Sequence, residues 1–411
     1  MAAGAAVVTV RVRAQPPLPS VSLRSAATLM VGPAAQLAVT TPASGSIAVE
    51  VSGPRLLPGT EVRVASRDAA TPHPIASLAK ALTAFEVLKV RPLAVGEEGP
   101  QYRVTEQDVA DYRAAAAGGG SYVAVSDGEV FTERQLLLAL MLPSGNNIAE
   151  TLARWSGGSR DAFLAEAEAT AGTLGMTATH LVDPSGFDPG TVASAADLAH
   201  LGRAVLAQPA LAAIVATQHA MLPDGTAIDN LDTALHDVPG WLGIKTGNTD
   251  AAGGCLLFAA RRAPDGDPDP ADAVTVVGAV LGQHSAGGTP AGDRGAAILA
   301  ARAAVNSALS GFTPVRPGAL APTVDGTVTA PWGASTPVAL GDPTAPQPWV
   351  ASAGTDLVLR VSTAPAAAPL AAGAVVGRVE ALAGGTLIAT WPVQVLHAVP
   401  APDWTWRLEH G

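Results

Sequence analysis

The order of its apolar segments constrains the fold of this chain more than any other feature of the sequence. Short runs at 47–51 and 61–65 have the composition and alternation of a strand pair. Helical patterns follow, and three longer strand-like runs, GWLGIKTG, GGCLLFAARR and AVTVVGAVLG, then lie between residues 240 and 282. Because a sheet buries its faces against helices, we expect the first strands to meet the last in one sheet beside a helical lobe, an α+β fold.

Boundary signals place the helices between these strands. A helix is predicted at 78–90, and the Gly-rich stretch 118–130 predicts a short hairpin. Thr132 and Gln135 have the spacing of a capping box before the apolar run LLLALML, and Pro143 ends that helix in a turn. Further helical patterns lie at 160–174, 194–206, 209–217 and 291–309.

The two ends of the chain differ from its middle. Residues 14–45 are rich in Pro, Ser and Ala and have the composition of an extended linker. Beyond residue 314, short Val/Thr/Leu runs alternate with Pro and Gly, as in a small all-β domain. Apolar residues 2–10 fit either the remainder of a signal or anchor segment or an irregular N-terminus, and both readings stay open. The expected division is therefore an N-terminal segment at 1–45, a main domain at 46–313 and a β domain at 314–411.

Composition excludes several classes of function. A formal net charge of −11 argues against a nucleic-acid partner, which needs a basic face. Cys255 is the only cysteine, so no disulfide can form within the chain, and its apolar strand predicts a place in the core. The histidines show no ligand spacing, and no nucleotide-binding motif occurs, so we expect neither a metal nor a cofactor.

Lysine usage directs attention to two positions. The chain has 24 lysines and arginines, and only Lys80, Lys89 and Lys245 are lysines. Arginine cannot lose its proton near neutral pH, whereas a crowded lysine can act as a base. Lys80 follows Ser77 by three residues at a predicted helix start, so its amine can reach the serine hydroxyl and activate it as a nucleophile. The alternative for the pair alone is a helix cap with a surface lysine.

Two further polar motifs follow at wide spacing. Ser144 and Asn146 lie in the turn after Pro143, where a plain polar turn is the alternative. Lys245, Thr246 and Gly247 end an apolar strand, where a strand-end turn with a solvated lysine would look the same. A lysine and a hydroxyl there could bind a carboxylate, and glycine allows a ligand to approach the backbone closely. Their order, each on its predicted element, makes a shared site the better interpretation.

Together these motifs resemble those of the penicillin-binding proteins and serine β-lactamases, and more narrowly the low-molecular-mass serine D-Ala-D-Ala carboxypeptidases. The resemblance implies a five-stranded antiparallel sheet with a helical lobe across about residues 45–310, with a more weakly similar β domain after it. It rests on the strings ASLAKALTA (76–84), LMLPSGNNIAETLA (140–153), LGMTATHLVDPSGFD (174–188), TAIDNLDT (226–233) and GIKTGNTDAAGGCLLFAARR (243–262).

The resemblance also implies roles in a reaction. Ser77 would be the acylated nucleophile and Lys80 its general base, while Ser144 would relay a proton towards the leaving amine. The backbone N–H groups of Ser77 and Asn248 would form the oxyanion hole. Lys245, a second cation, would help keep Lys80 a free base.

Other residues would hold the substrate. Asn146 would orient its amide, and Lys245 and Thr246 would hold its terminal carboxylate, with Gly247 allowing close approach. The family's second motif often runs S-G-N-D, and Asn147 stands here in the last place. We expect that difference to affect the cleft or a loop and not to abolish activity.

The implied function is removal of the terminal D-Ala from peptidoglycan stem peptides outside the cytoplasm, with β-lactams as covalent inhibitors. A serine β-lactamase and a DD-endopeptidase are alternatives, although a fast lactamase would need a loop glutamate, and Glu166 and Glu168 fall in a predicted helix. A non-catalytic peptidoglycan-binding protein is a third. The C-terminal DWTWRLEHG shows no amphipathic membrane helix, so any membrane tether is expected at the N-terminus.

Overall fold

The computed structural model describes residues 16–31, 39–58, 62–65 (backbone only), 68–264, 266, 272–320 and 322–410. These residues form two compact units. The α+β unit comprises the described parts of Ala38–Pro54 and Glu61–Ser310. The β unit comprises the described parts of Met1–Leu37, Arg55–Thr60 and Gly311–Gly411. Residues 2–10, for which a signal or anchor remnant was one interpretation, lie outside the described residues.

One five-stranded sheet organises the α+β unit, and each neighbouring pair of its strands is antiparallel. The strands from the two ends of the unit meet where Val49 pairs with Gly278, which confirms the expectation that the first strands join the last. In spatial order the strands are β11 (Trp241–Thr249), β12 (Gly253–Arg262), β13 (Val274–Gln283), β3 (Ser46–Ser52) and β4 (Val62–Ala65).

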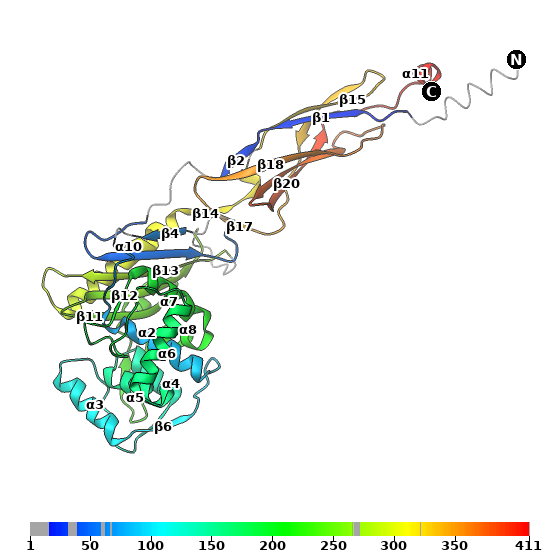
Figure 1. Ribbon diagram of the computed structural model, residues 1–411. Helices are drawn as coiled ribbons and strands as arrows, with labels where there is room; N and C mark the ends of the chain where they lie inside the picture. The colour runs from blue at the N-terminus through cyan, green and yellow to red at the C-terminus, as the bar shows by residue number, and fades with distance from the viewer. Residues whose placement is uncertain are drawn as a thin grey trace, which may run out of the picture. The chain divides into compact units, whose positions relative to one another are not determined.

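Helices cover both faces of this sheet (Figure 1). A long helix, α10 (Pro290–Ser310), packs on β12 and β13 from one side, and α7 (Ala195–Ala207) packs on β13 and β3 from the other. The α7 side extends into the helical lobe, whose core is continuous with that face of the sheet. The other helices are η1 (Ala76–Leu78), α2 (Ala79–Val90), α3 (Glu106–Ala117), α4 (Glu133–Met141), α5 (Asn146–Gly157), α6 (Arg160–Thr173), α8 (Pro209–Val215) and α9 (Ala234–Asp237).

Of two local structures predicted from the sequence of the lobe, one is confirmed and the other is wrong. Thr132 and Gln135 form the predicted capping box at the start of α4. The hairpin predicted at 118–130 is wrong, because only β7 (Val130–Thr132) is a strand there, and it pairs with β6 (Gln101–Arg103). Residues 121–123 bond instead to the start of α5, so their polar backbone groups are satisfied without a hairpin.

The β unit contains a seven-stranded sheet that uses both ends of the chain. The prediction of a linker throughout 14–45 is wrong for β1 (Ser20–Ser25) and β2 (Thr28–Val31), which pair with β15 and β18. Val21, Leu23 and Leu29 pack on the core of the unit, and this burial explains why the segment is ordered. The remaining strands of the sheet are β15 (Val324–Thr329), β16 (Ser335–Leu340), β18 (Thr355–Thr363), β19 (Val375–Ala383) and β20 (Thr386–Val395). A separate pair joins β14 (Phe312–Val315) to β17 (Trp349–Ser352).

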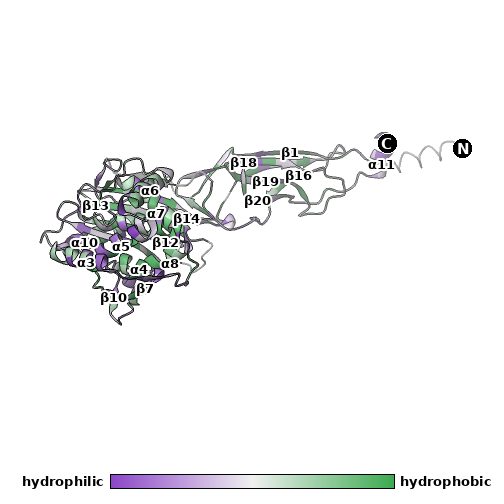
Figure 2. Ribbon diagram, turned by 60° about the horizontal axis from the view of Figure 1, so that its bottom comes forward, coloured by the Kyte–Doolittle hydropathy of each residue, from purple (hydrophilic) through white to green (hydrophobic). Residues whose placement is uncertain are grey.

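The end of the chain differs from the sequence expectation. A short helix, α11 (Trp404–His410), forms where no helix was expected, and the Asp403 carboxylate accepts the Trp406 N–H at 2.8 Å near its start. Figure 2 colours α11 mainly as hydrophilic. In the described part of the chain, no single helix is long and apolar enough to cross a membrane; only α7 and α8 together, bent by 108°, reach that length and composition.

Candidate active site

Ser77 lies on a tight turn at the start of the long lobe helix. It occupies η1, directly before α2, and the preceding Ala76 has a φ of +47°, unusual for a residue other than glycine. The Ile75 N–H donates to the Thr191 carbonyl at 3.3 Å, which fixes the approach to this turn. Such a strained conformation is found where surrounding structure holds it for a functional reason.

Lys80 is fully buried one turn further on and makes three polar contacts. Its Nζ lies 2.8 Å from Ser77 Oγ, 2.7 Å from Asn146 Oδ1 and 2.9 Å from the Ser185 carbonyl oxygen. The first two distances bring together three residues that sequence spacing predicted for one site. The third partner, a backbone carbonyl, was not foreseen.

Burial, and secondarily the positive charge of Lys245, hold the pKa of Lys80 well below its usual range, while Asp183 acts in the opposite direction. A neutral amine has two N–H donors and one lone pair. The two carbonyl-type oxygens of Asn146 and Ser185 can take the two donors, which leaves the lone pair for the Ser77 hydroxyl proton. The contacts of Lys80 therefore fit a general base.

Ser144 occupies the turn between α4 and α5 with a φ of +70°. Its side chain is 2% exposed, and its Oγ has no hydrogen-bond partner among the described residues. This hydroxyl is therefore available to bond to a ligand or to a water molecule. No hydrogen bond joins Ser144 to Ser77 or Lys80, so the proposed relay through Ser144 stays a prediction.

The Lys245–Gly247 segment lies on β11, one of the two edge strands of the five-stranded sheet. Lys245 is buried, donates to the Thr246 carbonyl at 3.1 Å, and has a pKa lowered to about 7, chiefly by burial. A Cβ on Gly247 would lie 3.1 Å from both the Ile75 carbonyl oxygen and the Ser77 backbone nitrogen. This strand therefore approaches the nucleophile turn closely enough to favour glycine; the close approach of a ligand, which was the expectation for Gly247, stays a prediction.

The neighbouring Asn248 has its side chain engaged elsewhere. It hydrogen-bonds to the Asp293 carboxylate near the start of α10. Only the backbone N–H of Asn248 is therefore a candidate for the oxyanion hole, which agrees with the role expected from the resemblance but does not test it.

A loop that sequence reasoning did not assign to the site completes it. The Asp183 carboxylate accepts the N–H groups of Gly186 at 3.1 Å and Phe187 at 3.0 Å, and the Ser185 and Thr191 hydroxyls. The sequence did offer a sign of this loop, because the string DPSGFD (183–188) carried part of the resemblance. Because the contact to Lys80 comes from a backbone carbonyl, residue type alone could not reveal it.

Gly186 explains how this loop reaches the nucleophile turn. Its φ is +74°, and a Cβ there would lie 1.8 Å from the carbonyl oxygen of Ala76. Only glycine fits this approach without displacing backbone. The loop and the turn are thus packed backbone against backbone.

Asn147 and Cys255, both noted in the sequence, have clear places, and so does His73. Asn147 is 1% exposed, and its side chain accepts from the Val123 N–H at 3.0 Å and donates to the Val123 carbonyl at 2.9 Å. It holds a loop, one of the two effects expected for it. Cys255 is buried as predicted, and burial raises its pKa to about 12. His73 lies on β5 (His73–Pro74), beside a separate small pocket of about 210 Å³.

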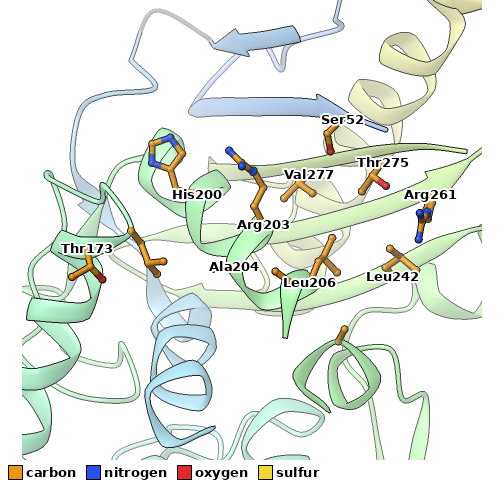
Figure 3. Close-up of a pocket in the computed structure, with 13 residues that line it drawn as sticks. Ser52, Thr173, His200, Arg203, Ala204, Leu206, Leu242, Arg261, Thr275 and Val277 are labelled. Carbon is orange, nitrogen blue, oxygen red and sulfur yellow. The ribbon is translucent and has the colours of Figure 1, made fainter. Parts of the chain in front are cut away.

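Pocket size alone does not identify the site. A pocket of about 830 Å³ includes Asn146 and Ser185 in its lining. A larger one, about 920 Å³, lies beside α7 and contains Arg203 and Arg261 but none of the predicted site residues (Figure 3). In the described residues, no group of three or more His, Cys, Asp or Glu side chains is arranged to hold a metal ion.

Comparisons with known proteins agree with this architecture. The chain matches the crystal structure of the Streptomyces K15 DD-transpeptidase with a TM-score of 0.54 and 24% identity, over 66% of this chain and 100% of that one. It also matches that of a D-alanyl-D-alanine carboxypeptidase from Mycobacterium tuberculosis, with a TM-score of 0.51 and 33% identity, over 66% of this chain and 94% of that one. The fold is that of the DD-peptidases.

Sequence comparisons identify the family to which the chain belongs. The model of the D-alanyl-D-alanine carboxypeptidase family matches residues 59–267. A D-alanyl-D-alanine carboxypeptidase of Mycobacterium tuberculosis is 40% identical over 205 residues, which are 48% of this chain and 66% of that protein. One of Streptomyces K15 is 30% identical over 64% of this chain and 89% of that protein. The chain belongs to the D-alanyl-D-alanine carboxypeptidase family. The chain spans just under two thirds of the length of the first of these relatives.

Proposed function

We propose that this protein is a serine-type carboxypeptidase that removes the terminal D-Ala from peptidoglycan stem peptides ending in D-Ala-D-Ala. The observation that carries the proposal is the fully buried Lys80 amine, which lies 2.8 Å from Ser77 Oγ. Burial holds the pKa of this amine well below its usual range, which favours its neutral form. Family membership gives the substrate class. The substrate lies outside the cytoplasmic membrane, so the protein would act in the cell envelope.

In the first half of the reaction, Ser77 Oγ attacks the carbonyl carbon between the two D-Ala residues, and its proton passes to Lys80. The backbone N–H groups of Ser77 and Asn248 stabilise the oxyanion. The peptide C–N bond then breaks, and the leaving amine receives a proton through Ser144. The products of this half are free D-Ala and an acyl-enzyme ester on Ser77.

In the second half, water attacks the ester carbonyl. Lys80 accepts a proton from this water, and Ser77 leaves with a proton restored to its oxygen. Lys245 and Thr246 hold the substrate's terminal carboxylate in the first half, and Asn146 orients its amide. No metal or cofactor is required by these steps.

Labelling with a fluorescent penicillin tests the nucleophile. We expect stoichiometric covalent label on the wild type and on the exposed-serine control Ser126→Ala, and none on Ser77→Ala. A label retained by Ser77→Ala, or absent from the wild type, would overturn the assignment. Rapid loss of label from the wild type would favour a β-lactamase instead.

Release of D-Ala from diacetyl-Lys-D-Ala-D-Ala tests the bond that is cut. We expect one D-Ala per peptide from the wild type and none from Ser77→Ala. Penicillin labelling without D-Ala release would contradict the carboxypeptidase and direct attention to the endopeptidase, whose substrate is a cross-linked dimer.

A further inference from the structure

The pocket of about 920 Å³ lies where the helical cover of one face of the five-stranded sheet stops. Helix α7 packs on this face, since a Cβ built on its Gly202 would lie 2.6 Å from Cγ1 of Val277 on β13. The helix ends at Ala207, and residues near the ends of β3, β12 and β13 line the pocket beside it. The pocket therefore has the sheet as one wall and α7 as another.

The strands contribute a row of three polar side chains to this pocket. Thr275 on β13 pairs with Arg261 on β12 and with Ser52 on β3. Residues directly opposite each other on antiparallel strands project to the same face, and Thr275 shares its face with Val277, two residues further on. Neighbouring strands are about 4.8 Å apart, so the row spans about 10 Å. Figure 3 shows these three residues on the strands next to the helix.

The row is not engaged in holding the fold together. Among the described residues, no side-chain hydrogen bond or ion pair joins Arg261, Thr275 or Ser52 to another group; Arg261 and Ser52 are exposed, and Thr275 is half-buried. The next residue of β12, Arg262, faces the other side of the sheet, where its Nη2 donates to Asn306 Oδ1 of α10 at 2.7 Å. One of two neighbouring arginines thus has a structural partner, and the other has its donors available for a ligand.

The charges of the lining favour an anion. A second guanidinium group, that of Arg203 on α7, is paired with Glu50 at 3.2 Å, but its side chain is 53% exposed and also lines the pocket. No aspartate or glutamate belongs to the lining in the part of the chain that the structure describes. The whole chain has a formal net charge of −11, so a pocket with two arginines and no carboxylate is a local exception to its acidic character.

The shape of the donor set and the apolar lining narrow the class of anion. Three donor side chains from three strands suit a group with at least three acceptor oxygens, which a phosphate has and a carboxylate lacks. The pocket is also lined by Leu174, Leu206 and Leu242, each half-buried and packed on the core. These leucines offer apolar surface to a ligand, which a bare inorganic ion could not use.

We propose that this pocket binds a phosphate ester with an apolar substituent. Arg261, Thr275 and Ser52 donate to the phosphate oxygens, and the three leucines contact the substituent. None of the residues assigned to the reaction at Ser77 lines the pocket, so the inference does not depend on the proposed function. A soluble ester and a phospholipid headgroup share this chemistry, and binding measurements separate the two sources.

Calorimetry with hexyl phosphate, and with inorganic phosphate for comparison, tests the class of ligand. We expect hexyl phosphate to bind more tightly by about tenfold, the effect of burying about two of its methylene groups. No binding of hexyl phosphate, or equal affinity for the two probes, would overturn the proposal. Sedimentation with phosphatidylcholine vesicles only when they contain phosphatidic acid would identify a lipid headgroup as the source, and binding of hexyl phosphate alone would identify a soluble ester.

Variants assign the binding to the row of donors. Arg261→Gln should weaken hexyl phosphate binding by about tenfold, the effect of losing hydrogen bonds to a charged group, and Thr275→Val by about fivefold. Arg262→Gln is the matched control, because it removes the same charge from the next residue on the opposite face of the sheet. Penicillin labelling of all three variants at the wild-type rate would show that they are folded. Equal losses in Arg261→Gln and Arg262→Gln would mean that net charge alone attracts the ligand, and would overturn the site.

Discussion

The two units of this protein differ in the polar and ionisable side chains that they bury. Among the described residues, the α+β unit buries ionisable side chains such as Lys80, Lys245 and Glu133, whereas the buried polar residue of the β unit is Thr336. Both non-glycine residues with positive φ in the described chain, Ala76 and Ser144, also belong to the α+β unit. These costly features belong to the unit that holds the candidate active site, and the β unit follows the ordinary rule of apolar core and polar surface.

Among the predicted changes, removal of the buried Lys80 amine from the α+β unit should have the largest effect on the rate of acylation. Lys80→Met keeps the length of the side chain but has no base and no charge to bury. We expect acylation by penicillin to slow by about 10³-fold, the range of a lost general base, with the melting temperature unchanged or raised. Stopped-flow labelling and thermal unfolding measure the two effects. Acylation within tenfold of the wild type would show that Lys80 is not the base.

A backbone contact provides the next test. Gly186→Ala places a methyl group against the Ala76 carbonyl, and we expect a loss of about 3 kcal/mol and about 100-fold slower acylation. Gly225→Ala is the control, because its φ of +85° is equally unfavourable but nothing lies within 4 Å of the new Cβ. It should cost about 1 kcal/mol and leave acylation unchanged. Similar effects of both variants would mean that strain, and not the loop contact, dominates.

The β unit should respond differently to a cavity in its core. Leu357 on β18 is fully buried, so Leu357→Ala should cost that unit about 3 kcal/mol. The rate constant for acylation should not change, because every group assigned to the reaction lies in the α+β unit. Val358→Ala, at a neighbouring position that is 56% exposed, is the control for both measurements. Slower acylation by Leu357→Ala would show that the β unit supports the reaction.

The smallest expected effect concerns a buried carboxyl away from the reaction. Glu133 is buried with no hydrogen-bond partner for either oxygen in the described structure, and burial, opposed by Arg91, raises its pKa to about 7. Because the folded protein holds this proton more tightly than the unfolded chain, its stabilising effect is complete below pH 4.5 and is lost as pH rises to 7.

Glu133→Gln removes that titration. We expect it to be more stable than the wild type by about 2 kcal/mol at pH 8 and equally stable at pH 4, measured by urea unfolding. Glu166→Gln, an exposed change on α6, should show no such pH dependence. An equal difference at both pH values would contradict a titrating Glu133.

The sequence predicted the site better than the connections around it. The spacing of Ser77 and Lys80 on one helical turn is local, and the separate motifs at Ser144 and Lys245 each sit on the element type that was expected. The Ser185 carbonyl was missed because any residue has one, and only the tertiary approach at Gly186 places it. The pairing of β1 with β15 was missed because a short alternating strand does not reveal a partner about 300 residues away.

That pairing has a consequence for how the protein is made. Ser20 and Thr329 are hydrogen-bonded although 309 positions separate them, so β1 leaves the ribosome long before its partner exists. Joining such distant segments through a flexible chain would cost about 5 kcal/mol of loop entropy. The α+β unit reduces that cost, since its folding brings the Thr40 N–H within 2.8 Å of Ser307 Oγ. We therefore expect the α+β unit to fold first during synthesis, because its folding brings the two chain segments that lead to β1 and β15 close together before the seven-stranded sheet forms.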